Sequence, residues 1–162
     1  MNQDVETARN QMVSYAYDIF RYYDYEYIYK INQGIESLKT STLPEADVAV
    51  YDAEFRFLRA YTYFQMCIRM GGIPLVTATQ SYTSGMDISE LQTPRSTEAE
   101  VYEYVYNECM AVKETLAANN NVKYVSRANK YTALALAGRS MLYAGSIAKY
   151  NAAMSNPVHS DL

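Results

Sequence analysis

The chain has 162 residues, a formal net charge of −4, 49% hydrophobic residues and 20% charged residues. This length suits one domain with a sizeable core, and the charge gives no clustered excess of Lys and Arg for neutralising nucleic-acid phosphates. No apolar run approaches the roughly 20 residues that cross a bilayer, and the acidic start MNQDVETARN is unlike a secretory signal. We therefore expect no nucleic-acid partner, and either a cytosolic location or a signal that has been removed.

The first predicted element is a helix at residues 5–38, which contains the tyrosine-rich stretch RYYDYEYIYK. Tyrosines at positions 25, 27 and 29 alternate as in a strand, but apolar residues continue beyond them at helical spacing. The helix is therefore favoured over the strand, and Tyr23 and Tyr27 are predicted to be core residues. The stripe that predicts this consists of Phe20, Tyr23, Tyr27, Ile31, Ile35 and Leu38.

Three other tyrosines, Tyr22, Tyr25 and Tyr29, fall on the opposite side of this helix, close to Asn32, Gln33 and Glu36. A sugar site needs an aromatic face for the C–H side of the ring, and amides or carboxylates for the hydroxyls. The three tyrosines are therefore candidate ligand-binding residues. The alternative is a second packing face, covered by a helix outside this chain.

Turn chemistry separates three further predicted helices. Pro44 stands at the opening of a helix, where proline is tolerated, and Gly71 stops the apolar pattern that follows. Thr97 and Glu100 match a capping box, in which each side chain satisfies a backbone N–H. An all-α fold of stacked helical hairpins, similar to tetratricopeptide packing, is predicted. The three helices are expected at 45–70, 98–117 and 127–150.

Residues 77–96 are predicted to form a loop rich in Ser, Thr, Gly, Asp and Gln. About twenty residues without regular structure is long for a compact domain, and long loops often carry function. Tyr82 is expected to be exposed in this loop, which makes it a further candidate for ligand binding.

Residues suited to catalysis are scarce. His159, the single histidine, lies in a polar tail, so neither a histidine-dependent nucleophile nor a zinc site is expected. No Gly-rich phosphate loop follows a strand pattern. Cys67 and Cys109 lack CxxC partners and are expected to be buried free thiols. We therefore expect no enzymatic activity, no metal and no cofactor.

The stretch AEFRFLRAYTYFQMCIRMGGIPLVT at 53–77 resembles the helix and turn typical of the SusD-like (RagB/SusD) nutrient-binding lipoproteins of Bacteroidetes. Three more segments resemble that family in the same order, and together the four cover roughly residues 15–150. The three segments are YEYIYKINQGIESL, PRSTEAEVYEYV and SRANKYTALALAGRSMLYAG. The positions that match the family motif with a structural role include Glu54, Arg59, Gly71, Pro74 and Arg95.

The resemblance implies that the chain is part of the helical, tetratricopeptide-like half of a larger SusD-like fold. It also implies a lipid-anchored protein on the outer face of the outer membrane, although the lipobox cysteine is absent. Such proteins cap a SusC-like TonB-dependent transporter and bind oligosaccharides, or oligopeptides in some members. The implied function is therefore non-catalytic glycan binding for delivery to the transporter. The alternative is a docking module that contacts the transporter and has no ligand site of its own.

Two arginines of the motif have expected partners. Arg59 lies in an otherwise apolar helix, so it must be paired where it is buried, and Glu54 and Glu45 are the candidates. The alternative for Arg59 is a hydrogen bond to a ligand. Arg95 is expected to anchor the long loop against the helices.

Overall fold

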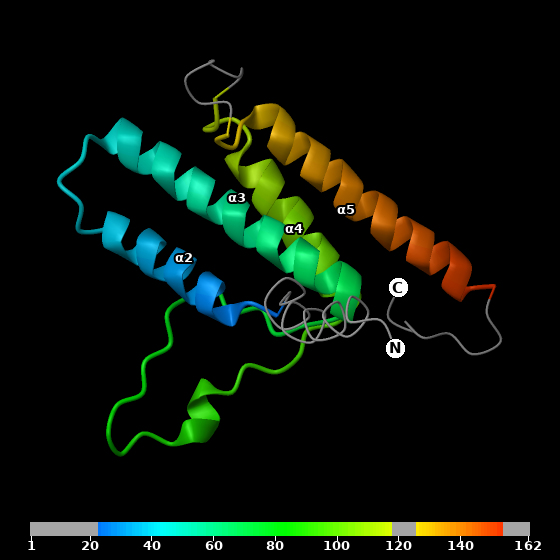
Figure 1. Cartoon of the computed structure of the whole chain (residues 1–162), viewed down its shortest axis with the longest axis horizontal. Coiled ribbons are helices and arrows are strands. Elements are labelled where there is room, and N and C mark those ends of the chain that lie inside the picture. The colour runs from blue at the N-terminus through cyan, green and yellow to red at the C-terminus, as the bar shows by residue number, and fades with distance from the viewer. Residues whose placement is uncertain (1–22, 118–125, 154–162) are drawn as a thin grey trace, which may run out of the picture.

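The structure is a computed structural model that describes residues 23–117 and 126–153. No strand occurs in these residues, and the all-α fold is confirmed. A short 3-10 helix, η1 (Ile88–Leu91), lies in the long loop before α4. The α-helices of the described part are α2 (Tyr25–Leu38), α3 (Glu45–Met70), α4 (Glu98–Val112) and α5 (Lys130–Asn151), as Figure 1 shows.

Helices that follow one another in the chain also pack against one another: α2 packs on α3, α3 on α4, and α4 on α5. This arrangement is a stack of helical hairpins, as predicted, and the long loop between α3 and α4 extends away from the helices (Figure 1). The expected helical residues 5–22 lie outside the described part of the chain. The stack therefore places α2 and the long loop at one side, and α5 at the other.

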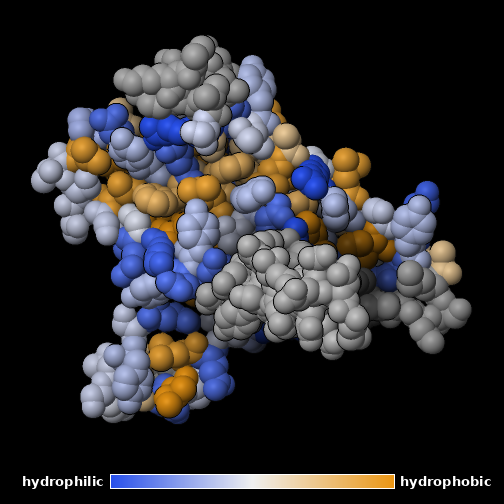
Figure 2. All heavy atoms as spheres, viewed as in Figure 1, coloured by the Kyte–Doolittle hydropathy of each residue, from blue (hydrophilic) through white to orange (hydrophobic). Residues whose placement is uncertain are grey.

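The core lies between α3, α4 and α5, where large side chains of α3 and α4 meet small side chains of α5. Ser140 is buried on α5 and its hydroxyl donates to the carbonyl of Tyr102 at 3.0 Å. Small residues on α5, such as Ala133 and Ala137, let its backbone approach α4 closely. Apolar patches also reach the surface along α5 (Figure 2). Fully buried core residues include Ala60, Tyr63, Phe64, Met66, Val101, Tyr102, Val105, Ala133 and Ala137.

The end of α3 is shaped by two glycines. Gly71 follows the helix with φ 71°, a left-handed value that favours glycine, and its N–H donates to the carbonyl of Cys67. A Cβ on Gly72 would overlap the carbonyl oxygen of Ser96. The Ser96 N–H also donates to the Ile73 carbonyl at 3.2 Å. The chain leaving α3 therefore lies directly against the chain entering α4.

Helix α4 ends earlier than the sequence pattern suggested. The expected helix runs to 117, whereas α4 ends at Val112 and turns follow. The N–H groups of Thr115 and Leu116 both donate to the carbonyl of Val112. Leu116 is still buried, so the apolar spacing continues past the end of the helix. That continued burial is why periodicity alone placed the helix end too late.

The buried face of α2 differs from the prediction. Tyr23 and Tyr27 are 50% and 41% exposed, so their assignment to the core is wrong. The buried residues of α2 are Ile28, Ile31 and Asn32. Tyrosine has an apolar ring and a polar tip, so it tolerates a half-exposed position. The stripe was misplaced because tyrosines were counted as core residues and the buried asparagine as a polar surface residue.

Candidate functional site

A buried polar network binds residues 73–79, the segment that follows α3, to side chains of α2 and α3. Arg59 Nη1 donates to Asn32 Oδ1 and to the Thr77 carbonyl, both at 2.8 Å. Asn32 Nδ2 donates to the carbonyls of Val76 at 3.0 Å and Ala78 at 3.1 Å. Because an extended segment has no internal backbone bonds, these side chains supply the partners that its carbonyls need.

Two tyrosines hold the same segment. The Tyr63 hydroxyl donates to the Val76 carbonyl at 2.9 Å and accepts from the Val76 N–H at 2.7 Å. The Tyr25 hydroxyl donates to the Pro74 carbonyl at 2.6 Å. Burial raises the pKa of both hydroxyls, so both stay protonated at any physiological pH. Tyr25 thus packs against the core and does not share an exposed face with Tyr29.

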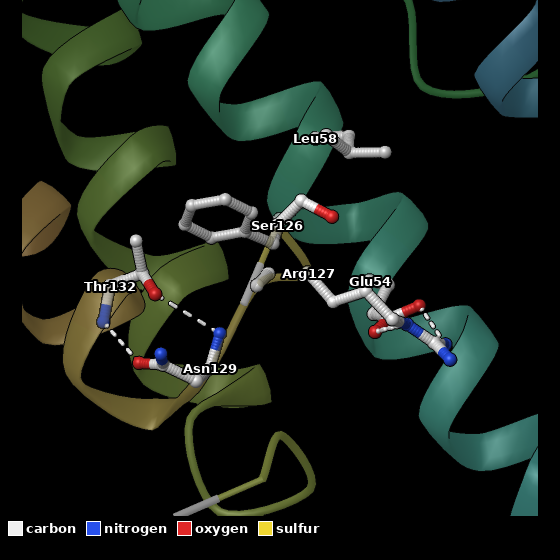
Figure 3. Close-up of a pocket in the computed structure, with 8 residues that line it drawn as sticks. Glu54, Leu58, Ser126, Arg127, Asn129 and Thr132 are labelled. Carbon is white, nitrogen blue, oxygen red and sulfur yellow. Dashed lines mark hydrogen bonds and ion pairs between the residues drawn. The ribbon is translucent and has the colours of Figure 1, made fainter. Parts of the chain in front are cut away.

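The partners expected for Arg59 were wrong. Besides Asn32 and the Thr77 carbonyl, Arg59 pairs with Glu108 of α4, with Nη2 and Oε2 3.4 Å apart. Glu54 instead pairs with Arg127 (Figure 3). Residues five apart point roughly 140° away from one another around a helix, so Glu54 and Arg59 face different neighbours. Arg59 is therefore a structural residue within the hairpin stack.

Glu108 joins two arginines of α3 to α4. Arg56 binds it through two hydrogen bonds, Nε to Oε2 at 3.0 Å and Nη2 to Oε1 at 2.7 Å. Burial opposes ionisation of Glu108, but the hydrogen bonds and charges of Arg56 and Arg59 outweigh it and hold the pKa below its ordinary value. The carboxylate is therefore ionised at neutral pH and its ion pairs are at full strength.

Arg95 anchors the long loop as expected. Its Nη2 donates to the Met70 carbonyl at 2.7 Å, and its Nε donates to the Gly72 carbonyl. A guanidinium group at the C-terminus of α3 also interacts favourably with the helix dipole. The contacts tie the far end of the loop to the start of the loop.

A polar groove of about 570 Å³, called here the α2 groove, lies between α2 and the first residues of the long loop. Glu36 Oε1 accepts from the Thr79 N–H at 2.9 Å, and Oε2 accepts from the Thr79 hydroxyl at 2.5 Å. Gln33 Nε2 donates to the Tyr29 hydroxyl at 3.2 Å. The groove is lined by Tyr29, Gln33, Gly34, Glu36, Ser37, Thr40, Thr79 and Ser81.

The α2 groove combines one aromatic ring with amide, carboxylate and hydroxyl groups. The hydrogen bonds from the Thr79 hydroxyl and N–H lower the pKa of Glu36, so its carboxylate is ionised and accepts hydrogen bonds. Ser37 donates its hydroxyl to the Gln33 carbonyl at 2.8 Å, on the same helix face. An ionised carboxylate, an amide and hydroxyls beside a tyrosine ring are groups that can bind a polyhydroxylated molecule.

Of the tyrosines predicted to bind ligand, the structure places Tyr29 alone in the α2 groove. Tyr22 lies outside the described residues. Tyr82 is 61% exposed in the long loop, as expected, but it does not line the groove. Sequence reasoning missed Thr79 and Ser81, because no local pattern indicates which helix a distant loop residue will meet.

A second hollow, of about 400 Å³, lies between α3 and the start of α5 (Figure 3). Two sets of interactions border it. Arg127 binds Glu54 through both Nε and Nη2, and Asn129 and Thr132 cap α5 by a reciprocal pair of hydrogen bonds. These polar groups position the beginning of α5 against α3. The hollow is therefore better explained by helix packing than by ligand binding.

The described residues show how the metal-ligating and nucleophilic side chains of this part of the chain are placed. No group of three His, Cys, Asp or Glu side chains in this part of the chain is placed to hold a metal ion. Cys67 and Cys109 are buried free thiols, as expected, and burial raises the pKa of Cys109 to about 12. His159 lies outside the described residues. None of the described helices combines the length and the apolar character needed to cross a membrane.

The fold and the groove define an all-α protein of stacked helical hairpins with an open polar groove on its surface. The family model described as "SusD-like_3: Starch-binding associating with outer membrane" matches residues 1–142. The chain belongs to this SusD-like family. No curated protein matches the chain.

Solved structures show the same fold. A SusD-like protein from Bacteroides fragilis is 31% identical, with a TM-score of 0.64 over 76% of this chain and 23% of that chain. A laminarin-binding SusD-like protein is 23% identical, with a TM-score of 0.64 over 79% of this chain and 27% of that one. Surface glycan-binding protein A from Bacteroides uniformis is 20% identical, with a TM-score of 0.64 over 78% and 27%. The chain thus spans about a quarter of the length of these structures.

Proposed function

We propose that the chain binds glycans without chemical conversion, as part of a SusD-like protein on the outer membrane that delivers them to a SusC-like TonB-dependent transporter. Family membership supports the proposal, together with the laminarin-binding and glycan-binding relatives of the same fold. Oligopeptides are the other ligand class that the proposal allows.

The observation that carries the proposal is the composition of the α2 groove. Tyr29 offers a half-exposed ring, and the side chains of Gln33 and Glu36 lie one and two turns along the same face. Thr79 and Ser81 add hydroxyl groups from the long loop. A sugar ring presents an apolar C–H face and a rim of hydroxyls, and this groove offers a counterpart to each.

Calorimetric titration of the chain with a panel of neutral oligosaccharides and oligopeptides tests the proposal. We expect at least one oligosaccharide to bind, and Tyr29→Ala to weaken that binding about fivefold, because the ring contact contributes roughly 1 kcal/mol. Tyr131→Ala is the matched control, since it removes an exposed tyrosine from α5. Circular dichroism checks that each variant is folded.

Two outcomes of this titration would count against the proposal. One is the absence of heat with every oligosaccharide. The other is binding that Tyr29→Ala and Tyr131→Ala leave equally strong, because the α2 groove would then not be the binding site. Heat with oligopeptides alone would transfer the function to the peptide-binding class.

The outer face of α5 favours a second candidate function, docking to the transporter or to the remainder of a longer chain. Leu142 is 74% exposed there, and Tyr131 and Tyr150 are 63% and 60% exposed. Gly138 and Gly145 lie within α5, and a Cβ on either would meet no atom within 4 Å. Glycine inside a helix costs about 0.5–1 kcal/mol relative to alanine, so two such glycines suggest close approach by a partner.

Co-purification with a co-expressed SusC-like barrel tests the docking function. Leu142→Glu places a charge on the exposed face and is expected to abolish co-purification while leaving glycan binding intact. Tyr29→Ala is the reciprocal control, because it should weaken glycan binding and leave docking intact. Retention of Leu142→Glu by the barrel would count against docking through α5.

A further inference from the structure

The charge of the α2 groove is set by one residue. Among the described residues that line the groove, Glu36 alone carries a charge at neutral pH, and neither Lys nor Arg is present. The side chains beside it are hydroxyls and an amide, which carry no net charge. A ligand in the groove therefore meets one negative charge, and these lining residues carry no positive charge to offset it.

The carboxylate of Glu36 is held in place. Thr79 donates to both of its oxygens, at 2.9 Å from the N–H and 2.5 Å from the hydroxyl. The same bonds lower its pKa, and the charge of Lys39 adds to the shift, so the group stays negative at mildly acidic pH. Each carboxylate oxygen can accept further hydrogen bonds, so the anchored group is still available to a ligand.

Two lysines of α2 and its C-terminal end lie outside the lining of the groove. Lys39 does not line it, and Lys39 is exposed at the end of α2. Lys30 is engaged with Glu26, with Nζ and Oε1 2.7 Å apart, and it too is absent from the lining. The field inside the groove is therefore set mainly by Glu36.

This field acts in opposite directions on two classes of glycan. A sugar hydroxyl donates to a carboxylate, and such charge-assisted hydrogen bonds are stronger than neutral ones. A carboxylated or sulfated sugar would instead bring a second negative charge within a few ångströms, where like charges repel and dissolved salt screens only in part. We propose that Glu36 is the specificity-determining residue of the α2 groove, which selects neutral glycans over anionic ones. This inference rests on the proposed glycan-binding function.

The test compares three forms of one ligand, the neutral oligosaccharide that binds the chain most tightly. The forms are the neutral sugar, its C6-oxidised uronate and the methyl ester of that uronate. The ester controls for loss of the C6 hydroxyl, because it has the same carboxyl group without the charge and with one added methyl group. Calorimetry is expected to give about tenfold weaker binding for the uronate than for the ester at low salt, and a smaller difference at high salt.

Variants separate the role of Glu36 from the general acidity of the chain. Glu36→Gln keeps the shape of the side chain and one oxygen that accepts a hydrogen bond from Thr79. It should reduce the ratio of the ester affinity to the uronate affinity below about threefold. Glu26→Gln is the matched control, since Glu26 is an exposed acid of the same helix that does not line the groove. We expect it to keep the tenfold ratio.

The outcomes distinguish the selectivity from the function on which it rests. Tyr29-dependent binding of ester and uronate with equal affinity would overturn the selectivity and leave the glycan-binding function standing. A ratio unchanged in Glu36→Gln would also overturn the role of Glu36. The absence of binding by any of the three forms would overturn both proposals together. The salt dependence in the unaltered chain gives a further readout that needs no folded variant.

Discussion

Asn32 is the residue whose removal tests the structural argument most directly. It is 1% exposed, and its side chain makes three hydrogen bonds, to the carbonyls of Val76 and Ala78 and to the guanidinium of Arg59. Asn32→Ala removes all three hydrogen bonds and leaves the buried guanidinium of Arg59 with fewer partners. The 73–79 segment would then lose two of its hydrogen bonds to α2, and those made by Tyr25 and Glu36 would remain.

The expected loss of stability follows from these bonds. Two neutral hydrogen bonds contribute about 1 kcal/mol each and the bond to the charged guanidinium about 2 kcal/mol. Partial compensation remains, because Val76 still accepts from Tyr63, and Arg59 still donates to the Thr77 carbonyl. Alanine also favours the helix by about 0.5 kcal/mol. We therefore expect Asn32→Ala to lower the free energy of unfolding by about 3 kcal/mol.

Urea unfolding followed by circular dichroism measures this loss. An unchanged slope of the free energy of unfolding against urea concentration shows that the same transition is compared. Gln33→Ala is the matched control, because it removes an exposed amide from the next position of the same helix. Its effect should lie within about 0.5 kcal/mol. A loss below about 1 kcal/mol for Asn32→Ala would refute the claim that the network fixes the segment.

Two further predictions concern backbone packing and pH. Gly72→Ala should lower the free energy of unfolding by about 2 kcal/mol, because a Cβ would overlap the opposing backbone. Gly138→Ala should instead raise it by about 0.5–1 kcal/mol, because the added Cβ meets open space. Equal melting temperatures for the two variants would contradict this prediction. Arg56 and Arg59 hold the pKa of Glu108 below its ordinary 4.5, so its stabilising effect is complete above that pH and is lost as pH falls through the lowered value. Glu108→Gln should therefore lose less stability than the unaltered chain between about pH 6 and pH 3 in urea titrations, and parallel losses would contradict the assignment.

Much of the fold could be predicted because its signals are local. The capping box of Thr97 and Glu100 is present at the start of α4, and Gly71 ends α3. Each of these signals depends on residues within one helical turn. The buried stripe of α2 was misjudged because Tyr23 and Tyr27 are suited equally to core and surface positions. Their placement depends on which neighbour the helix meets.

The candidate site was only half visible in the sequence. Tyr29, Gln33 and Glu36 could be grouped because helical spacing places them on one face. Thr79 could not be added, since it reaches Glu36 from a position 43 residues further along the chain. The same limit explains why Glu54 was chosen as the partner of Arg59, when the structure supplies Glu108 from another helix.

The sequence by itself determined the all-α character, both ends of α3, the start of α4, and the ordered segments that resemble the SusD-like family. Backbone hydrogen bonding, capping and apolar spacing act over a few residues, so a pattern along the chain is enough to indicate them. Tertiary structure alone decided which side of α2 is buried, which carboxylates pair with the arginines, and how the loop completes the α2 groove. Those outcomes depend on contacts between distant segments. The backbone of residues 73–79, for example, is bound from α2 by Tyr25, Asn32 and Glu36, and from α3 by Arg59 and Tyr63.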